Sequence, residues 1–289
     1  MDKGGRDEKG ASDMAIRFEK ISKQPRVFNR IFGVSVEQAQ SIRGGVRPFW
    51  EEKIKGSYKR PGRNAKLELA DQVLMLLLYY RSYVTMVFVG HLFGIDDSNV
   101  CRIIKRLEPL VAKVTAITKD RTYRDLDLEL IIDATEQPIE RPRKRQKRYY
   151  SGKKKRHTLK TEIRINGKGE IKHVSKSRPG SIHDFELHKK EPPVPRDARV
   201  YVDSGYQGLD KRHRDTELPY KRKKKKLEKE ERDYNRTLSS FRVKVENILA
   251  QIKLFKIIGE RYRNKRRGYG VKMNIIAGIV NMKNGFSAA

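Results

Sequence analysis

Apolar positions recur with two different periods along the chain. Between Lys66 and Val114 they fall at the three-, four- and seven-residue spacings of amphipathic helices. From Leu126 onward the pattern changes to short β-branched and aromatic runs separated by turn residues. This change predicts an all-α region over 61–120 and an α/β layer domain over 121–289.

The region before residue 61 is less regular. About twenty polar and glycine-bearing residues predict a frayed terminus, and a small helical arm is expected from Pro25 to Lys59. Gly44-Gly45 and Pro48 interrupt the apolar clusters of that arm, and Pro61-Gly62 marks a break after it. Residues 1–60 are therefore expected to be a polar terminus followed by a small helical arm.

Three helices are predicted in succession over 67–81, 85–93 and 98–110. The first is dense in Leu and Met and is expected to be buried, while Thr85 and Gly94 are suitable caps for the second. Either Asp96 or Asp97 can cap the third. Helices two and three form a plausible helix-turn-helix, and the alternative is an ordinary three-helix bundle. The residues expected to be exposed for reading DNA are Ser98, Asn99, Arg102 and Lys105.

The α/β region is expected to contain a hairpin, a helix, another strand and closing helices. The turn Asn166-Gly167-Lys168-Gly169 is a strong hairpin signal. Ser181 and Asp184 have the spacing of a capping box at the start of a helix. The predicted strands are 128–139, 159–165, 170–177 and 200–203, and the closing helices are 237–258 and 271–282.

Charge identifies the kind of partner. The chain of 289 residues has 67 Lys and Arg against 36 Asp and Glu, a net charge of +31, and a pI near 10.2. Such a balance indicates a polyanion, with double-stranded DNA or another nucleic acid favoured over an anionic membrane surface. No stretch approaches the roughly 18 to 20 apolar residues of a membrane span.

The compartment is inferred from cysteine usage and the chain start. Cys101 is the single cysteine, which excludes an intramolecular disulfide and a cysteine-rich zinc site. The first residues do not lead into a secretory apolar segment. We expect a cytoplasmic, nucleoid-associated protein in a bacterium, or a nuclear protein in a eukaryote.

Three basic runs stand out. Residues 141–156 hold ten Lys or Arg, 221–226 are all basic, and 261–267 hold five more. A charge run is usually a solvated face, but three in one cationic chain favour phosphate contact. Tyr149 and Tyr150 either stack on a splayed base or simply pack. The cations expected to bind DNA in the first run are Arg143, Arg145, Lys153, Lys154, Lys155 and Arg156.

Two carboxylates lie at the ends of predicted strands. Asp133 follows Leu130-Ile131-Ile132, and Asp203 follows Val200-Tyr201-Val202 and precedes Ser204-Gly205. A negative charge at the end of a buried strand must be stabilised by a metal, a cation or solvent. In a polycationic chain, this pair suggests metal ions acting on a phosphate backbone.

Glu246 is the candidate for a third carboxylate. It lies roughly a quarter turn from the apolar stripe of the helix over 241–255, and Arg242 and Lys253 fall on its own stripe. The alternative is an exposed, salt-bridged stripe. Carboxylates suit hard cations such as Mg²⁺, which take oxygen ligands.

These segments resemble a known family when taken together. Asp133-Ala134-Thr135, Asp203-Ser204-Gly205-Tyr206-Gln207-Gly208 and Arg242-Val243-Lys244-Val245-Glu246-Asn247 resemble the Asp, Asp, Glu signature of cut-and-paste transposases from bacterial insertion sequences. The likeness is greatest to the insertion-sequence-five group and its eukaryotic Harbinger relatives. Arg141-Pro142, the segment 150–157 and the segment 179–184 are also similar to family segments, in family order.

The resemblance implies a ribonuclease H-like catalytic domain behind a helix-turn-helix DNA-binding region. Asp133, Asp203 and Glu246 become catalytic metal ligands for two Mg²⁺ ions, which Mn²⁺ can replace. Arg242 and Lys253 would contact phosphates near the transposon end. The signature's Tyr would fall at Ser239, so no stacking role is assigned there.

The implied function is a transposase that binds terminal inverted repeats, cleaves the DNA and joins the freed strand to a target. A homodimer on DNA is expected, because two ends must be cut together. The alternatives are a catalytically inactive DNA-binding regulator and a standalone metal-dependent endonuclease.

Four further residues have more than one interpretation. Asp184 either caps a helix with Ser181 or supports the metal site together with His183. His157 and His173 are expected on strand surfaces rather than as ligands.

Overall fold

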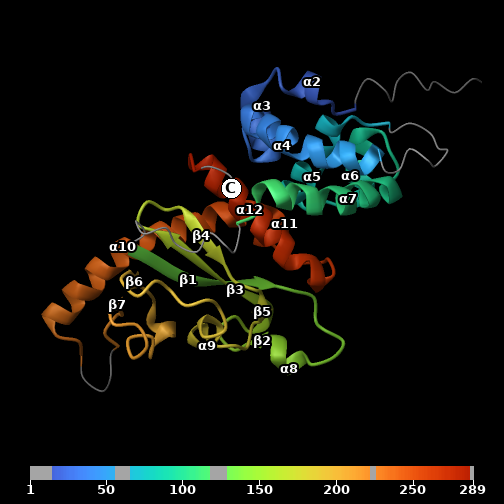
Figure 1. Cartoon of the computed structure of the whole chain (residues 1–289). Coiled ribbons are helices and arrows are strands. Elements are labelled where there is room, and N and C mark those ends of the chain that lie inside the picture. The colour runs from blue at the N-terminus through green and yellow to red at the C-terminus, as the bar shows by residue number, and fades with distance from the viewer. Residues whose placement is uncertain (1–14, 56–65, 118–128, 222–225, 287–289) are drawn as a thin grey trace, which may run out of the picture. The chain divides into compact units, whose positions relative to one another are not determined.

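The computed structural model describes residues 15–55, 66–117, 129–221 and 226–286, and its chain divides into two compact units (Figure 1). Unit 1 comprises the residues up to Thr115 together with 255–257, and unit 2 comprises the remainder. The first fourteen residues of the predicted polar terminus, the break at Pro61-Gly62 and most of the 221–226 basic run lie outside the described residues.

Unit 1 is entirely helical in its described part. Leu69 to Tyr80 are all buried, which confirms the predicted buried helix. The Phe28 and Phe32 rings pack against each other with centroids 4.7 Å apart and form part of the same apolar interior. The helices are α2 (Phe18–Ile21), α3 (Pro25–Phe32), α4 (Val36–Lys55), α5 (Leu69–Ser82), α6 (Met86–Phe93) and α7 (Asp97–Thr115).

Two expectations for the N-terminal arm are wrong. Residues just after position 14 are docked, because Phe18 is buried and its N–H donates to Asp71 Oδ1 at 2.8 Å. Helix α4 also runs without a break through Gly44-Gly45 and Pro48. A Cβ at Gly45 would lie 2.6 Å from Val114 Cγ1, so this glycine permits close packing between α4 and α7.

The helix-turn-helix has the predicted caps. Thr85 Oγ1 accepts from the Phe88 N–H at 3.3 Å at the start of α6. Gly94 ends that helix with a φ of 69°, a left-handed conformation that favours glycine. The Asp96 carbonyl accepts from Val100 N–H at 3.0 Å and begins the hydrogen bonding of α7.

Unit 2 is built on a mixed sheet with the order β2-β3-β1-β6-β7, and β4 and β5 also pair with β3. Strand β1 is antiparallel to β3 and parallel to β6. The strands are β1 (Glu129–Pro138), β2 (Tyr150–Ser151), β3 (Arg156–Asn166), β4 (Ile171–Val174), β5 (Arg178–Pro179), β6 (Arg199–Tyr201) and β7 (Thr216–Glu217).

Helices cover both faces of this sheet (Figure 1). On one face Leu130, Ile132, Val200 and Val202 form a core with Tyr206, close to α9. On the other face lie α10 and α12. The helical segments of unit 2 and its boundary are α8 (Gln146–Tyr149), α9 (Asp184–His188), η1 (Ser204–Tyr206), α10 (Lys229–Lys253), α11 (Lys256–Gly259), η2 (Arg266–Gly268) and α12 (Tyr269–Lys283).

The predicted strands, hairpin and closing helices are present, with shifted ends. The hairpin turn closes through Gly169 N–H to the Asn166 carbonyl at 2.9 Å. The capping-box prediction is wrong: α9 begins at Asp184 with His183 as N-cap, and Ser181 Oγ instead donates to the Arg148 carbonyl at 2.7 Å. Ser181 is thus used to fix the 141–149 loop rather than the helix.

Candidate active site

The register of the strands brings Asp133 and Asp203 to the same end of the sheet. Strands β1 and β6 pair in parallel, with Ile131 opposite Tyr201. Asp133 and Asp203 each lie two residues beyond that pair. Because residues at equal offsets in paired parallel strands remain neighbours, the two carboxylates are carried to the same end of the sheet.

Both side chains face α10. The Tyr201 ring stacks on Phe241 of α10, with centroids 4.8 Å apart and an interplanar angle of 10°. Side chains two residues apart in an extended chain share a face, so Asp203 follows Tyr201 to the α10 side. Asp133 follows its partner Ile131 in the same way.

A third aspartate, Asp184, approaches from α9. A Cβ placed on Gly205 would lie 2.5 Å from Asp184 Oδ2 and 2.9 Å from Asp203 Oδ1. Gly205 therefore occupies the space between these two carboxylates, and any side chain there would collide with both. The Gly205 N–H also donates to Asp203 Oδ1 at 2.7 Å, which fixes that carboxylate.

Burial perturbs the pKa of Asp133. Burial raises its pKa to about 6, while the Ala134 N–H and the Arg242 guanidinium oppose the rise and the charges of Asp203 and Asp184 add to it. Like charges in a desolvated place destabilise one another. A cation bound here would offset both the desolvation of Asp133 and its repulsion by Asp203 and Asp184.

Lys160 positions Asp184. Its Nζ is 2.8 Å from Asp184 Oδ1 and 3.4 Å from Glu136 Oε1, and it donates to the Ile182 carbonyl at 2.7 Å. The side chain is only 9% exposed. The buried cation Lys160 therefore holds Asp184 close to Asp203, and Asp184 makes no capping bond with Ser181.

Glu246 stands apart from the aspartates. Its side chain is 57% exposed, and its Oε1 lies 3.8 Å from the Arg242 guanidinium. The described residues contain no group of three or more His, Cys, Asp or Glu arranged to hold a metal ion. The expected convergence of Asp133, Asp203 and Glu246 is therefore not found among the described residues, and Glu246 instead pairs with Arg242, whose charge also acts on Asp133.

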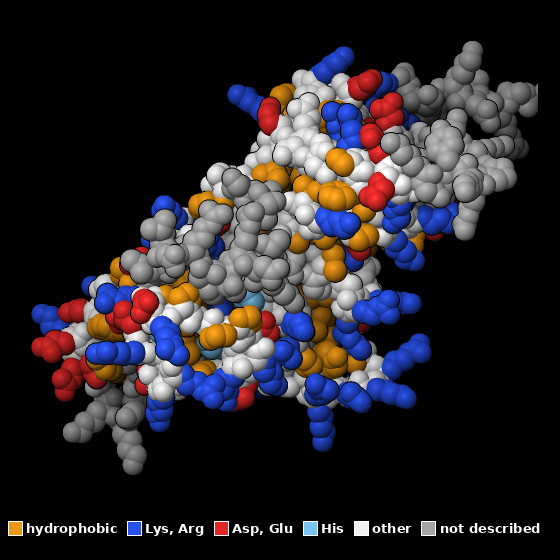
Figure 2. Space-filling view, in the orientation of Figure 1, with side chains coloured by type: hydrophobic (Ala, Val, Ile, Leu, Met, Phe, Trp, Pro, Cys, Tyr) orange, Lys and Arg blue, Asp and Glu red, His pale blue; other side chains and the backbone are white. Residues whose placement is uncertain are grey.

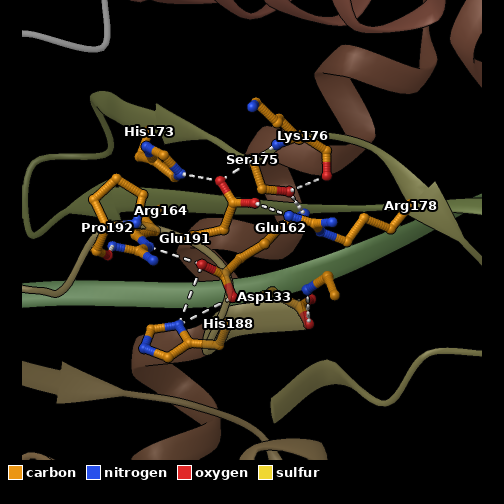
Figure 3. A network of polar contacts seen from close by, with 11 residues as sticks. Asp133, Glu162, Arg164, His173, Ser175, Lys176, Arg178, His188, Glu191 and Pro192 are labelled. Atoms are coloured by element: carbon orange, nitrogen blue, oxygen red, sulfur yellow. Dashed lines mark hydrogen bonds and ion pairs between the residues drawn. The ribbon is translucent and has the colours of Figure 1, made fainter. Parts of the chain in front are cut away.

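A buried polar network lies against the α9 face of the sheet (Figure 3). Glu162 Oε1 is 2.7 Å from Arg164 Nε, and its Oε2 is 3.1 Å from His188 Nδ1. Burial alone would raise the pKa of Glu162, but His188 and Arg164 together lower it. Arg164 also donates to the Pro192 carbonyl at 2.8 Å, so the network ties β3 to the chain after α9.

Tyr206 packs against this network, with its ring centroid 5.9 Å from that of His188. Its side chain is fully buried, and its hydroxyl has no hydrogen-bond partner among the described residues. Burial raises its pKa well above the usual value, and the charges of Glu162 and Asp133 raise it further. The hydroxyl therefore lies in the field of both groups.

The predicted DNA-reading side chains are exposed at the start of α7. Ser98, Asn99, Arg102 and Lys105 all face solvent. Arg102 donates to Asn99 Oδ1 at 2.9 Å, so these two side chains form one polar unit. Their exposure is what a reading helix requires.

The predicted phosphate-binding cations of unit 2 are also exposed, and Figure 2 shows Lys and Arg side chains projecting from the surface around α8. Lys153, Lys154 and Lys155 lie in the turn between β2 and β3, Arg156 is the first residue of β3, and the others are Arg143, Arg145 and Lys253. Arg242 differs from them, because only 19% of its side chain is exposed. His183 is exposed beside Asp184 and makes no side-chain capping bond.

Sequence reasoning missed Lys160, Glu162 and Arg164. They alternate along β3 with the apolar Ile163 and Ile165, and the charged positions face inward. Charged residues at every second position of a strand with such apolar neighbours are the signal that could have revealed them. His173 was expected on the surface but is buried, with Nε2 3.3 Å from Glu191 Oε2.

Within the part of the chain that the structure describes, no helix is both long and apolar enough to cross a bilayer.

Comparison with known proteins finds two family models that match the chain. Residues 65–116 match the helix-turn-helix of DDE superfamily endonuclease, and residues 132–282 match the DDE superfamily endonuclease itself. No solved structure matches the chain.

Two curated relatives are insertion-sequence proteins. A probable transposase for insertion sequence element IS702 from Microchaete diplosiphon is 38% identical over 89% of this chain and 94% of its own length. A putative transposase for insertion sequence element IS112 from Streptomyces albus G is 25% identical over 78% of this chain and 83% of its own length. The chain therefore belongs to the insertion-sequence transposases, with a helix-turn-helix ahead of a DDE endonuclease domain.

Proposed function

We propose that this transposase binds the terminal inverted repeats of its element through α7, cleaves the DNA there, and joins the freed 3′-hydroxyl to a target. The observation that carries the catalytic part is the parallel register of β1 and β6, which places Asp133 and Asp203 together. Water is the nucleophile of cleavage, and the 3′-hydroxyl is the nucleophile of joining.

The residues fit hard divalent cations. Asp133, Asp203 and Asp184 offer only carboxylate oxygens, which are the ligands that Mg²⁺ and Mn²⁺ prefer. The chemistry that two such ions supply is activation of the attacking oxygen and neutralisation of charge on the phosphate. We assign Asp133 and Asp203 as the main ligands.

Glu246 is proposed as the third ligand. It follows the buried Val245 on α10, the helix that faces both aspartates. Its present partner is Arg242, four residues earlier. DNA phosphates compete for the Arg242 guanidinium, so binding of the substrate can release Glu246 toward the acids.

The sheet supports a ribonuclease H-like catalytic domain. Its central β1 has an antiparallel neighbour on one side and a parallel neighbour on the other, with helices on both faces. We also propose that two copies act together on DNA, because two ends must be processed in one event.

A strand-transfer assay tests this function. A pre-cleaved element end is incubated with the protein, Mg²⁺ and a supercoiled target plasmid. A transposase produces covalently joined end and target, whereas a standalone nuclease only nicks or linearises the plasmid. An inactive regulator binds the end and does neither.

A further inference from the structure

Unit 2 has a second candidate site, a basic pocket formed by residues 139–145, Tyr149 and residues 262–267. Its volume is about 790 Å³. The two long segments are fastened together, because Ile139 and Tyr262 form a β-bridge and the Tyr262 N–H donates to the Pro138 carbonyl at 2.8 Å. This recess is therefore part of the folded sheet edge.

More than half of the residues that line the pocket are cationic. Eight of its residues are Lys or Arg, and Glu140 is its one acidic residue. Arg143, Lys144, Lys265 and Arg267 are exposed, and none of these four forms an ion pair with a carboxylate of the described chain. Unpaired cations gathered around one recess repel each other until an anion enters.

The pocket also contains an aromatic platform. The Arg266 guanidinium lies over the Tyr149 ring, 4.6 Å from its centroid. Arg145 begins the short helix carrying Tyr149 with a φ of 58°, a left-handed conformation that is uncommon for residues other than glycine. A strained backbone of this kind persists where the surroundings hold it.

We propose that the basic pocket binds an unpaired strand of DNA, through its phosphates and through a base that stacks beside Tyr149 and Arg266. A duplex keeps its bases stacked inside, so only an unpaired strand can present a base to a recess together with its phosphates. This inference rests on the proposed function in taking DNA as the substrate, and it adds a site that is separate from the carboxylates.

Charge-matched variants test the pocket. In the full-length protein, Arg143, Lys144, Lys265 and Arg267 are replaced together by Gln. The control replaces four exposed cations outside the pocket by Gln, namely Arg196, Lys211, Arg214 and Arg236. Fluorescence anisotropy without metal measures binding to an oligonucleotide of roughly 12 nucleotides, within the length that such grooves cover, and to the same sequence as a duplex. Thermal unfolding confirms that both variants are folded.

The pocket variant is expected to bind the single strand about tenfold more weakly than the control, with similar duplex binding by both. Equal loss in the two variants, or an equal loss on single strand and duplex by the pocket variant, would overturn the proposal.

A stacking test isolates Tyr149. Tyr149→Ala is expected to remove most of the quenching of a 2-aminopurine base in the single strand, and Tyr149→Phe is expected to retain it. Tyr150→Ala is the neighbouring control, since Tyr150 does not line the pocket. Unchanged quenching in Tyr149→Ala refutes the stacking contact. Failure of the proposed function shows differently, as absence of end cleavage and joining by the unmodified protein.

Discussion

Asp133 and Asp203 lie at the ends of paired strands, whereas Glu246 lies on a helix. The positions of the two aspartates are therefore fixed more firmly than that of Glu246. Backbone pairing of β1 with β6 fixes where the two aspartates lie. Glu246 projects from α10 with 57% of its side chain exposed and pairs with Arg242. The strand-borne part of the proposed site is preformed, while the position of the helix-borne acid depends on side-chain torsions and competing ion pairs.

The two aspartates also have a rigid setting behind them. Lys160 fixes Asp184, and the Glu162, Arg164 and His188 network braces the opposite face of the sheet. Glu246 has only a solvated ion pair, and such pairs stabilise little. On the proposed function, substrate binding rearranges Glu246 without disturbing the sheet.

Removing a strand-held acid should have the largest effect. Asp133→Asn and Asp203→Asn are each expected to reduce end cleavage and joining by a factor of roughly 10³ or more, because metal binding and charge stabilisation are lost together. Gel assays of cleavage and end binding measure this. Asp197→Asn, on an exposed residue, is the control. Activity within tenfold of the unmodified protein would remove either residue from the site.

Glu246 and Asp184 distinguish the two kinds of acid. Glu246→Gln is expected to abolish cleavage on DNA but to leave Mn²⁺ affinity of the free protein nearly unchanged, because Glu246 is turned outward there. Asp184→Asn is expected to weaken both by about 10- to 100-fold, the usual cost of losing a supporting group. Calorimetric titration with Mn²⁺ measures the effect of each variant on metal affinity, and cleavage rates measure its effect on the reaction. Loss of both Mn²⁺ binding and cleavage in Asp184→Asn, with both retained in Glu246→Gln, would show Asp184 as the third ligand.

Breaking the buried network should lower stability. Glu162→Gln leaves Arg164 without its carboxylate in a fully buried place, and losing one partner of such a pair costs about 3 to 5 kcal/mol in the free energy of unfolding. Urea unfolding measures the change, with the exposed Glu230→Gln as the control. A loss below about 1 kcal/mol, typical of surface pairs, would contradict this role.

Acidity provides a separate test of the burial of Asp133. Its folded pKa of about 6 exceeds the ordinary 3.8, so the folded protein holds a proton that the unfolded chain releases between these values. Stability without metal should therefore fall as pH rises from about 4 to 6 and stay lower above that window. Asp133→Asn removes this dependence and should be more stable than the unmodified protein by about 3 kcal/mol at pH 8. If the difference in free energy of unfolding between Asp133→Asn and the unmodified protein is the same at pH 5 and at pH 8, Asp133 is not desolvated.

Variants of the DNA-binding residues should have smaller effects than variants of the acids. Arg102→Ala is expected to reduce preference for the element's ends by about 1 to 2 kcal/mol relative to random DNA. Replacing Lys153, Lys154 and Lys155 by Gln should weaken both kinds of DNA and reduce the salt dependence. Competition binding at several salt concentrations separates the two. If Arg102→Ala weakens both DNAs equally, α7 is not the reader.

Local patterns were sufficient to predict the main elements. The apolar run before Asp133, the Asn166 to Gly169 turn and the caps Thr85 and Gly94 each have one favourable backbone arrangement, and the structure has it. The parallel pairing that joins Asp133 and Asp203 agrees with the family resemblance.

Packing between distant segments could not be predicted in this way. From the sequence alone, Gly45 is expected to interrupt a helix. In the structure it lies within α4, where the absence of a Cβ lets Val114 pack closely. Lys160 and Ser181 are satisfied by carbonyls of segments more than twenty residues away. Helical periodicity places Glu246 on a face of α10, but it does not decide whether the carboxylate meets Arg242 or the aspartates.

The most direct test of the preformed pair and the movable third acid is a structure of the protein bound to a pre-cleaved element end and Ca²⁺, which occupies oxygen sites without supporting the reaction. The account predicts Asp133 and Asp203 in their present places, with the Glu246 carboxylate turned inward as a ligand of an ion that one of them also binds. An ion held by Asp133, Asp203 and Asp184, with Glu246 still in solvent beside Arg242, would contradict it.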